Sequence, residues 1–252
     1  MPLHVSEAGR HIVLVTIDDQ PKRNAMSRTT LGELAALWDR IETAVACRCV
    51  VITGAGDKAF CAGADIGGDL TASAETVRVI NRALLKTTPF SKPIVAAVNG
   101  DCAGGGVELL LSTDIRIAAE PARFGLPEVR FSIYPFGGAT VKLVQQIGYV
   151  HAMDLLLTGR LVGADFAAGI GLVNRVLPPT QVLPAALEVA AQIAANSPSA
   201  VQAVKTQISA SIADFALSRE ALEQQLGDRV RASPHFAEGV AAFREKRRPD
   251  YA

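Results

Sequence analysis

The 252-residue sequence has no apolar run of the roughly 18 residues that a membrane-spanning helix needs. Its first residues also lack the charged-then-apolar order of a signal peptide. It has no net charge, because 25 Lys and Arg residues balance 25 Asp and Glu residues, and so it lacks the basic field that favours nucleic-acid binding. We therefore expect a cytoplasmic protein whose partners are neither membranes nor nucleic acids.

Cysteine is scarce too. The chain has four cysteines, Cys47, Cys49, Cys61 and Cys102, which are too few and too scattered for a disulfide framework. Cys47 and Cys49 stand two positions apart in an expected strand, so their side chains point the same way and cannot easily form a bridge. No His or third Cys lies nearby at the spacing of metal ligands. We expect reduced thiols and no metal site.

Apolar residues, in contrast, make up 49% of the chain, which is high for a soluble monomer. A chain of this length can bury a sizeable core as one large domain. The remaining apolar surface is what an interface between subunits would cover. The composition therefore favours a globular, oligomeric protein.

Strand-like and helix-like segments alternate along the first half of the chain. The segments 11–18, 49–54, 93–100 and 114–119 have the composition of strands. Ser27 has the position of an N-cap, and apolar residues follow it at helical spacing. Further helices are expected from about 73 to 85 and over 107–112. This alternation predicts an α/β fold.

The second half reads as mostly helical after Gly137-Gly138. A short helix is expected over 164–168 and a last strand over 172–176. From Gln181 onward the apolar spacing is helical, and Pro-containing breaks fall at 196–198 and 233–234. That C-terminal region has little core of its own, so we expect it to pack on the main domain or on a neighbouring subunit.

Two glycine-containing turns follow apolar strands, and each contains an acidic residue. The first reads AFCAGADI over 59–66, and the second reads NGDCAGGGVE over 99–108. Small residues let a backbone approach a ligand closely with its N–H groups free. Two such turns aimed at one point would form a two-donor hole for a developing oxyanion. We infer chemistry on a carbonyl compound.

Carboxyl groups accompany these turns. Glu108 lies in an apolar stretch just after a helix start, where burial would raise its pKa into the range of a general acid or base. The alternative is an exposed Glu that the helix dipole favours. Glu128 follows Pro127 in the segment FGLPE, where it is either a second catalytic carboxyl group or a surface carboxylate.

These motifs, in this order, resemble the enoyl-CoA hydratase/isomerase (crotonase) family. The resemblance rests on FCAGADI over 60–66, AVNG over 97–100, GGGVE over 104–108 and FGLPE over 124–128. It implies an α/β fold, a crotonase-like spiral of repeated ββα turns with a C-terminal helical region. The implied boundaries are 1–196 for the spiral core and 197–252 for the helical, oligomerising region, in a homotrimer or a dimer of trimers.

The resemblance also implies an acyl-CoA thioester substrate. No other cofactor is expected, since the sequence has neither a metal-ligand cluster nor a dinucleotide-binding fingerprint. Backbone N–H groups of Ala62 and Gly105 would hold the thioester oxygen. Glu108 and Glu128 would hold a water between them and transfer the protons. Having both carboxyl groups favours an enoyl-CoA hydratase, which adds water to a trans-2-enoyl-CoA to give a 3-hydroxyacyl-CoA.

By the same resemblance, a further set of residues would contact the CoA part. These are Ala62, Ala64, Asp65, Ile66, Lys22, Arg23 and Lys246 or Arg247. Phe136 departs from the family, since many hydratases have glycine there, and its ring is expected to narrow the acyl pocket or to change which atom water reaches. A Δ3-Δ2-enoyl-CoA isomerase, another family reaction, and a CoA-binding or RNA-binding scaffold are the alternatives.

Overall fold

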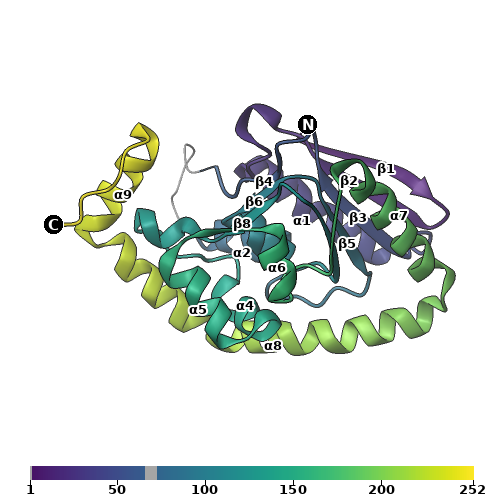
Figure 1. The fold of residues 1–252 in the computed structure, drawn as a ribbon. Coiled ribbons are helices and arrows are strands. Elements are labelled where there is room, and N and C mark those ends of the chain that lie inside the picture. The colour runs from purple at the N-terminus through teal and green to yellow at the C-terminus, as the bar shows by residue number, and fades with distance from the viewer. Residues whose placement is uncertain (1, 66–72) are drawn as a thin grey trace.

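The computed structural model describes residues 2–65 and 73–252, and two sheets organise them (Figure 1). The larger sheet has six strands in the order β1-β2-β3-β5-β7-β10. Within this larger sheet, β1 and β2 pair in antiparallel fashion, and the other neighbouring strands pair in parallel. Its strands are β1 (Leu3–Gly9), β2 (Ile12–Ile17), β3 (Cys49–Gly54), β5 (Ile94–Val98), β7 (Ile115–Ala119) and β10 (Arg175–Leu177).

The smaller sheet has four strands in the order β4-β6-β8-β9. They are β4 (Ala59–Cys61), β6 (Asp101–Ala103), β8 (Arg123–Gly125) and β9 (Leu161–Gly163). Each turn of the chain adds one strand to the larger sheet and the next strand to the smaller one, as β3 and β4, β5 and β6, and β7 and β8 show. The chain thus winds as a spiral of ββα turns, as predicted.

Helices α1 (Arg28–Thr43) and α2 (Ala74–Ala83) pack against each other and cover the core. The Ser27 Oγ atom accepts a hydrogen bond from the Thr30 N–H at 3.1 Å, which confirms the predicted N-cap of α1. The side chain of Trp38 is fully buried on the inner face of α1, and its Nε1 donates to the Ala83 carbonyl at 2.9 Å. The helical spacing after Ser27 therefore marked the buried face correctly.

Two predicted elements begin at other residues. Helix α3 (Gly105–Leu110) starts two residues before the expected Val107, because Gly105 and Gly106 already form its first turn. The last strand was expected over 172–176 but is β10, which pairs with β7 only from Arg175. Before it, Gly171 turns with a φ of +78°, and Asn174 exchanges hydrogen bonds with the Arg116 backbone.

The segment between β7 and β10 is largely helical, as expected. It contains α4 (Ala139–Ile147), α5 (Tyr149–Thr158) and α6 (Ala164–Gly169), after the short 3₁₀ helix η2 (Pro127–Phe131). Another 3₁₀ turn, η1 (Gln20–Lys22), precedes α1. Helix α7 (Pro179–Ala195) lies on the outer face of the larger sheet, where its alanines pack against β3, β5 and β7.

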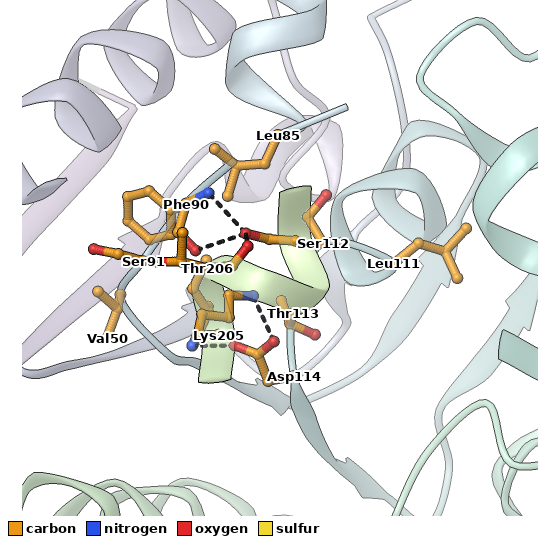
Figure 2. A network of polar contacts seen from close by, with 12 residues as sticks. Val50, Leu85, Phe90, Ser91, Leu111, Ser112, Thr113, Asp114, Lys205 and Thr206 are labelled. Carbon is orange, nitrogen blue, oxygen red and sulfur yellow. Dashed lines mark hydrogen bonds and ion pairs between the residues drawn. The ribbon is translucent and has the colours of Figure 1, made fainter. Parts of the chain in front are cut away.

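The long helix α8 (Pro198–Arg231) runs along one side of the molecule and leads to α9 (Pro234–Glu245) (Figure 1). The breaks between α7, α8 and α9 fall where the sequence predicts them. Figure 2 shows how the first half of α8 is tied to the core: the Lys205 Nζ lies 2.5 Å from the Asp114 carboxylate. Ser209 also accepts a hydrogen bond from the Phe90 N–H.

The four cysteines are all buried and unpaired, and burial raises the pKa of the Cys49 and Cys61 thiols to about 12. Among residues 2–65 and 73–252, no helix combines the length and apolar character needed to cross a membrane. The boundary between residues 196 and 197 stays a prediction.

We expect Gly106→Ala to destabilise the fold. A Cβ at Gly106 would lie 2.2 Å from the Cys61 carbonyl oxygen, and backbone cannot move aside as a side-chain end does. The expected loss of unfolding free energy is about 1–3 kcal/mol, measured by chemical denaturation. The matched control is Gly169→Ala in α6, where a Cβ meets nothing within 4 Å. Equal denaturation midpoints for the two variants would contradict this account.

Candidate active site

A cavity of about 280 Å³ lies where the two glycine turns meet the C-terminal helices. Its walls come from the two turns, α2, η2, the loop over 133–137, and α8 and α9. Seven of the predicted site residues line it together: Ala62, Ala64, Asp65, Gly105, Glu108, Glu128 and Phe136. The sequence motifs therefore converge on one site.

Glycines let the backbone segments at the cavity floor approach closely. Gly104 has a φ of +53°, which an L side chain rarely adopts, and a Cβ there would lie 2.9 Å from the Glu128 Oε1. A Cβ at Gly105 would lie 3.2 Å from the Ala64 nitrogen, and one at Gly63 would lie 3.3 Å from the Gly105 nitrogen. The amides of Ala64 and Gly105 are therefore neighbours.

The predicted donor at Ala62 needs correction. The Ala62 N–H donates to the Arg23 carbonyl at 3.0 Å, so it is not available to a substrate oxygen. The turn is held against residues 23–26, because Met26 also donates to the Gly63 carbonyl at 2.8 Å. Within the described residues, the N–H groups of Ala64 and Gly105 make no hydrogen bond, and both residues line the cavity.

Glu108 is 5% exposed in the first turn of α3, so the alternative of a solvent-exposed side chain is wrong. Burial raises the pKa of its carboxyl group to about 7. The N–H groups of Ala139 and Gly137 and the ammonium of Lys86 act in the opposite direction by stabilising the carboxylate. The Ala139 N–H donates to Oε1 at 3.2 Å.

Glu128 is half-buried at the start of η2, and its Oε2 atom is buried without a hydrogen-bond partner among the described residues. Burial, and after it the nearby charge of Glu108, raises the pKa of Glu128 to about 8. Two carboxyl groups that disfavour each other's ionisation hold a proton near neutral pH. The pair is therefore suited to give one proton and take another.

Sequence reasoning missed the groups that surround Glu108. Lys86 and Glu223 form a buried ion pair, with Nζ and Oε2 2.6 Å apart. Gly137 packs so tightly that a Cβ there would lie 2.4 Å from the Glu108 Oε2. The Gly137-Gly138 doublet marks only the start of the helical half in the sequence, and nothing in the sequence pairs Lys86 with a residue 137 positions further on.

Comparison with known proteins agrees with this geometry. A family described as Enoyl-CoA hydratase/isomerase matches residues 7–252. The chain belongs to the enoyl-CoA hydratase/isomerase family. The match extends over nearly the whole chain, including the cavity and the three C-terminal helices.

Individual relatives agree with this assignment. The chain is 40% identical to enoyl-CoA hydratase EchA19 of Mycobacterium tuberculosis, over 96% of this chain and 93% of that protein. It is 38% identical to mevalonyl-coenzyme A hydratase sidH of Aspergillus fumigatus, over 96% of this chain and 91% of that protein. The crystal structure of an enoyl-CoA hydratase/isomerase from Pseudoalteromonas atlantica superposes with a TM-score of 0.89 at 30% identity, covering all of both chains. The fold is therefore the crotonase fold.

In this family member, the ring of Phe136 lines the cavity but is held by α8. A Cβ at Gly227 would lie 1.9 Å from the Phe136 Cζ, and the Arg231 guanidinium lies 4.4 Å from the ring centroid. The Tyr134 ring packs against it at 5.2 Å. Phe136 thus forms part of the wall, and its effect on the acyl group stays a prediction.

The predicted CoA-binding cations lie outside the cavity lining. The Lys22 Nζ forms an ion pair with the Asp65 carboxylate at 2.6 Å, which raises the pKa of Lys22. Arg23 borders a separate hollow of about 80 Å³ beside η1. Lys246 caps the C-terminus of α9. Ile66 lies outside the described residues. Contacts of these residues with CoA stay predictions.

The described residues contain no cluster of three or more His, Cys, Asp or Glu side chains able to hold a metal ion. The chemistry that this cavity offers on its own is acid/base transfer by two carboxyl groups and hydrogen bonding by backbone amides.

We expect Glu108→Gln to stabilise the protein at pH 8 and to have little effect at pH 5. The folded pKa of Glu108 lies above its unfolded value, so the folded protein binds more protons between pH 4.5 and 7, and the wild type loses stability as the pH rises through that window. Removing the group recovers up to about 3 kcal/mol. Thermal unfolding at both pH values measures the difference.

The control for that measurement is Glu188→Gln on α7, which replaces an exposed carboxyl group away from the cavity. Its unfolding temperature should follow the wild type at both pH values. A difference between Glu108→Gln and wild type that does not change with pH would show that burial of Glu108 carries no ionisation cost.

Proposed function

We propose that this protein is an enoyl-CoA hydratase, a hydro-lyase that adds water across the double bond of a trans-2-enoyl-CoA to give a 3-hydroxyacyl-CoA. The observation that carries the proposal is the pair of carboxyl groups with raised pKa values, Glu108 and Glu128, beside two unused backbone N–H groups in one cavity. Relatives with hydratase names over most of their length support the reaction class.

The unused amides would act on the thioester oxygen. When water adds to C3, negative charge develops on that oxygen as the substrate becomes an enolate. The neighbouring N–H groups of Ala64 and Gly105 are the donors we assign to it, in place of Ala62. Removing one donor of this kind typically slows the reaction by about 100-fold or more. Both donors are backbone N–H groups, so the fold of the two glycine turns determines their positions.

The two carboxyl groups would divide the proton transfers. Glu108 receives hydrogen bonds from two amides and faces Lys86, so it is the better stabilised anion and takes the proton of the attacking water. Glu128 has only its own backbone N–H as a donor and faces the charge of Glu108, so it keeps its proton and delivers it to the α-carbon. One O–H bond of water and the O–H bond of Glu128 break, an O–H bond forms on Glu108, and the C2=C3 π bond is replaced by a C–O bond and a C–H bond. Return of the proton from Glu108 to Glu128 restores the pair, so one water is added in total.

The substrate would carry CoA, and we propose that no other cofactor is needed. We also propose a homotrimer or a dimer of trimers. Large apolar side chains exposed on α5 and α8 support this, since an interface would cover them. They include Tyr149, Val150, Leu157, Val204, Ile208 and Leu217. Sedimentation of the purified protein tests it. The cytoplasmic location stays a prediction.

The hydratase proposal predicts rapid loss of the enoyl-thioester absorbance with crotonyl-CoA or a longer trans-2-enoyl-CoA, with 3-hydroxyacyl-CoA as the product. Glu108→Gln and Glu128→Gln should each lower kcat by about 100-fold or more while CoA-ester binding persists. Glu188→Gln is the matched control and should keep full activity, since Glu188 is exposed on α7.

The same assay separates the alternatives. Conversion of a 3-enoyl-CoA to a 2-enoyl-CoA without incorporation of labelled water would make the protein an isomerase. Binding of CoA esters with no turnover of any enoyl-CoA, in wild type as in Glu108→Gln, would leave a scaffold and overturn the proposal.

Gly137→Ala should abolish most activity without unfolding the protein. The added Cβ would lie 2.4 Å from both the Glu108 Oε2 and the Leu84 Cδ1, which are ends of side chains that can move. Displacing the carboxyl group by about 1 Å is expected to lower kcat about 100-fold. Gly163→Ala, with nothing within 4 Å of its Cβ, serves as the control. Equal kcat values for the two variants would refute this role for Gly137.

A further inference from the structure

Glu223 is a buried carboxylate beside the cavity that the proposed reaction does not use. It comes from the second half of α8 and is 4% exposed. Its Oε2 lies 2.6 Å from the Nζ of Lys86, and the side chains of this ion pair are 6% and 3% exposed. The cost of withdrawing both ions from water largely offsets their attraction, so the pair adds little to stability. The hydrogen bonds of the pair lead to the groups around Glu108.

Lys86 holds one of the peptide groups that bind Glu108. Its Nζ donates to the carbonyl oxygen of Phe136 at 3.0 Å. That oxygen belongs to the same planar peptide as the Gly137 N–H, which donates to the Glu108 carboxylate. Fixing the oxygen on one side of the peptide fixes the direction of the N–H on the other side.

Glu223 also reaches the second peptide group that binds Glu108. Its Oε1 accepts a hydrogen bond from the Thr140 Oγ1 at 2.7 Å. Thr140 follows Ala139, whose N–H donates to the Glu108 Oε1 at 3.2 Å. Both amide donors to Glu108 are therefore tied, within one or two hydrogen bonds, to the same carboxylate of α8.

The ring of Phe136 adds a third connection to α8. It rests where Gly227 has no side chain, below the guanidinium of Arg231. The loop that binds Glu108 is thus held by α8 through a carbonyl, a hydroxyl and a ring. Tertiary contacts of this kind fix the orientation of a catalytic group more closely than its own rotamer preference does.

We propose that Lys86 and Glu223 are positioning residues, which orient the amides of Gly137 and Ala139 and thereby hold Glu108 at the angle and charge state that proton transfer from water requires. The inference rests on the proposed hydratase function. It makes α8 part of the catalytic apparatus, because the helix supplies the carboxylate on which both arms depend.

Glu108 faces charged and titratable groups from several elements. They are Lys86 after α2, Glu128 of η2, Tyr134 of the loop over 133–137, Lys142 of α4 and Glu223 of α8. Lys86 and Glu223 act on the pKa of Glu108 in opposite directions. Lys86 has the larger effect, so neutralising both residues raises the pKa of Glu108 in part through charge. The fall in kcat, and the titration of a Thr140 variant in which no charge changes, report the loss of oriented amides.

The test is the double variant Lys86→Met/Glu223→Gln, which leaves no unpaired buried charge and keeps an acceptor for Thr140. We expect a folded protein whose kcat falls about 10- to 100-fold with KM within about twofold. The titration of Glu108, followed by ¹³C NMR of its carboxyl carbon in the free protein, should move to higher pH. Glu108→Gln assigns the resonance.

The matched control removes a second ion pair between α8 and the core, with Lys205→Met/Asp114→Asn (Figure 2). It should leave kcat and the Glu108 titration unchanged, even where it lowers the unfolding temperature. A double variant at Lys86 and Glu223 with wild-type kcat and titration would overturn the proposal. If that variant does not fold, Thr140→Val provides the test. We expect a smaller fall in kcat and a smaller shift of the Glu108 titration to higher pH. No change in either would refute the proposal.

The two readouts also separate this inference from the hydratase proposal. A wild-type protein that hydrates no enoyl-CoA refutes the proposed function. The Glu108 titration in the free protein still shows whether Lys86 and Glu223 orient the amides around it, and an unchanged titration refutes that.

Discussion

Three backbone segments meet around Glu108. They approach one another and the Glu108 carboxyl group so closely that no side chain fits between them. Gly106 packs against the Cys61 carbonyl, Gly105 against the Ala64 amide, and Gly137 against Glu108 itself. The rest of the site depends on this close packing of backbone. It places the N–H groups of Ala64 and Gly105 side by side and encloses the carboxyl group of Glu108. The spiral winding supplies the three segments from separate turns.

Enclosure alone would leave Glu108 protonated and unable to act as a base. Burial raises its pKa, while two amides and the Lys86 ammonium lower it, and the balance falls near neutral pH. Glu128 receives no comparable support and stays more basic. The difference in acidity between two identical functional groups thus arises from the amides of Ala139 and Gly137 and the Lys86 ammonium, which stabilise only one of them.

Much of this could be read from the sequence, since glycine turns, caps and apolar spacing are local signals. Ser27 predicted the start of α1, and the two glycine turns predicted the converging segments. The choice between Ala62 and Ala64 could not be made, because it depends on which amide residues 23–26 engage. Lys86 and Glu223 gave no signal, because distant segments meet only in the folded chain and their pairing has no characteristic spacing.

The cavity wall that α8 and α9 provide also bears on synthesis. The glycine turns and both carboxyl groups lie within the first 128 residues, whereas Glu223, Phe236 and Phe243 close the cavity from the other end of the chain. A nascent chain can therefore assemble its sheets and still have an open, solvated site. The cavity becomes enclosed only once α8 and α9 have been synthesised and have packed onto the sheets.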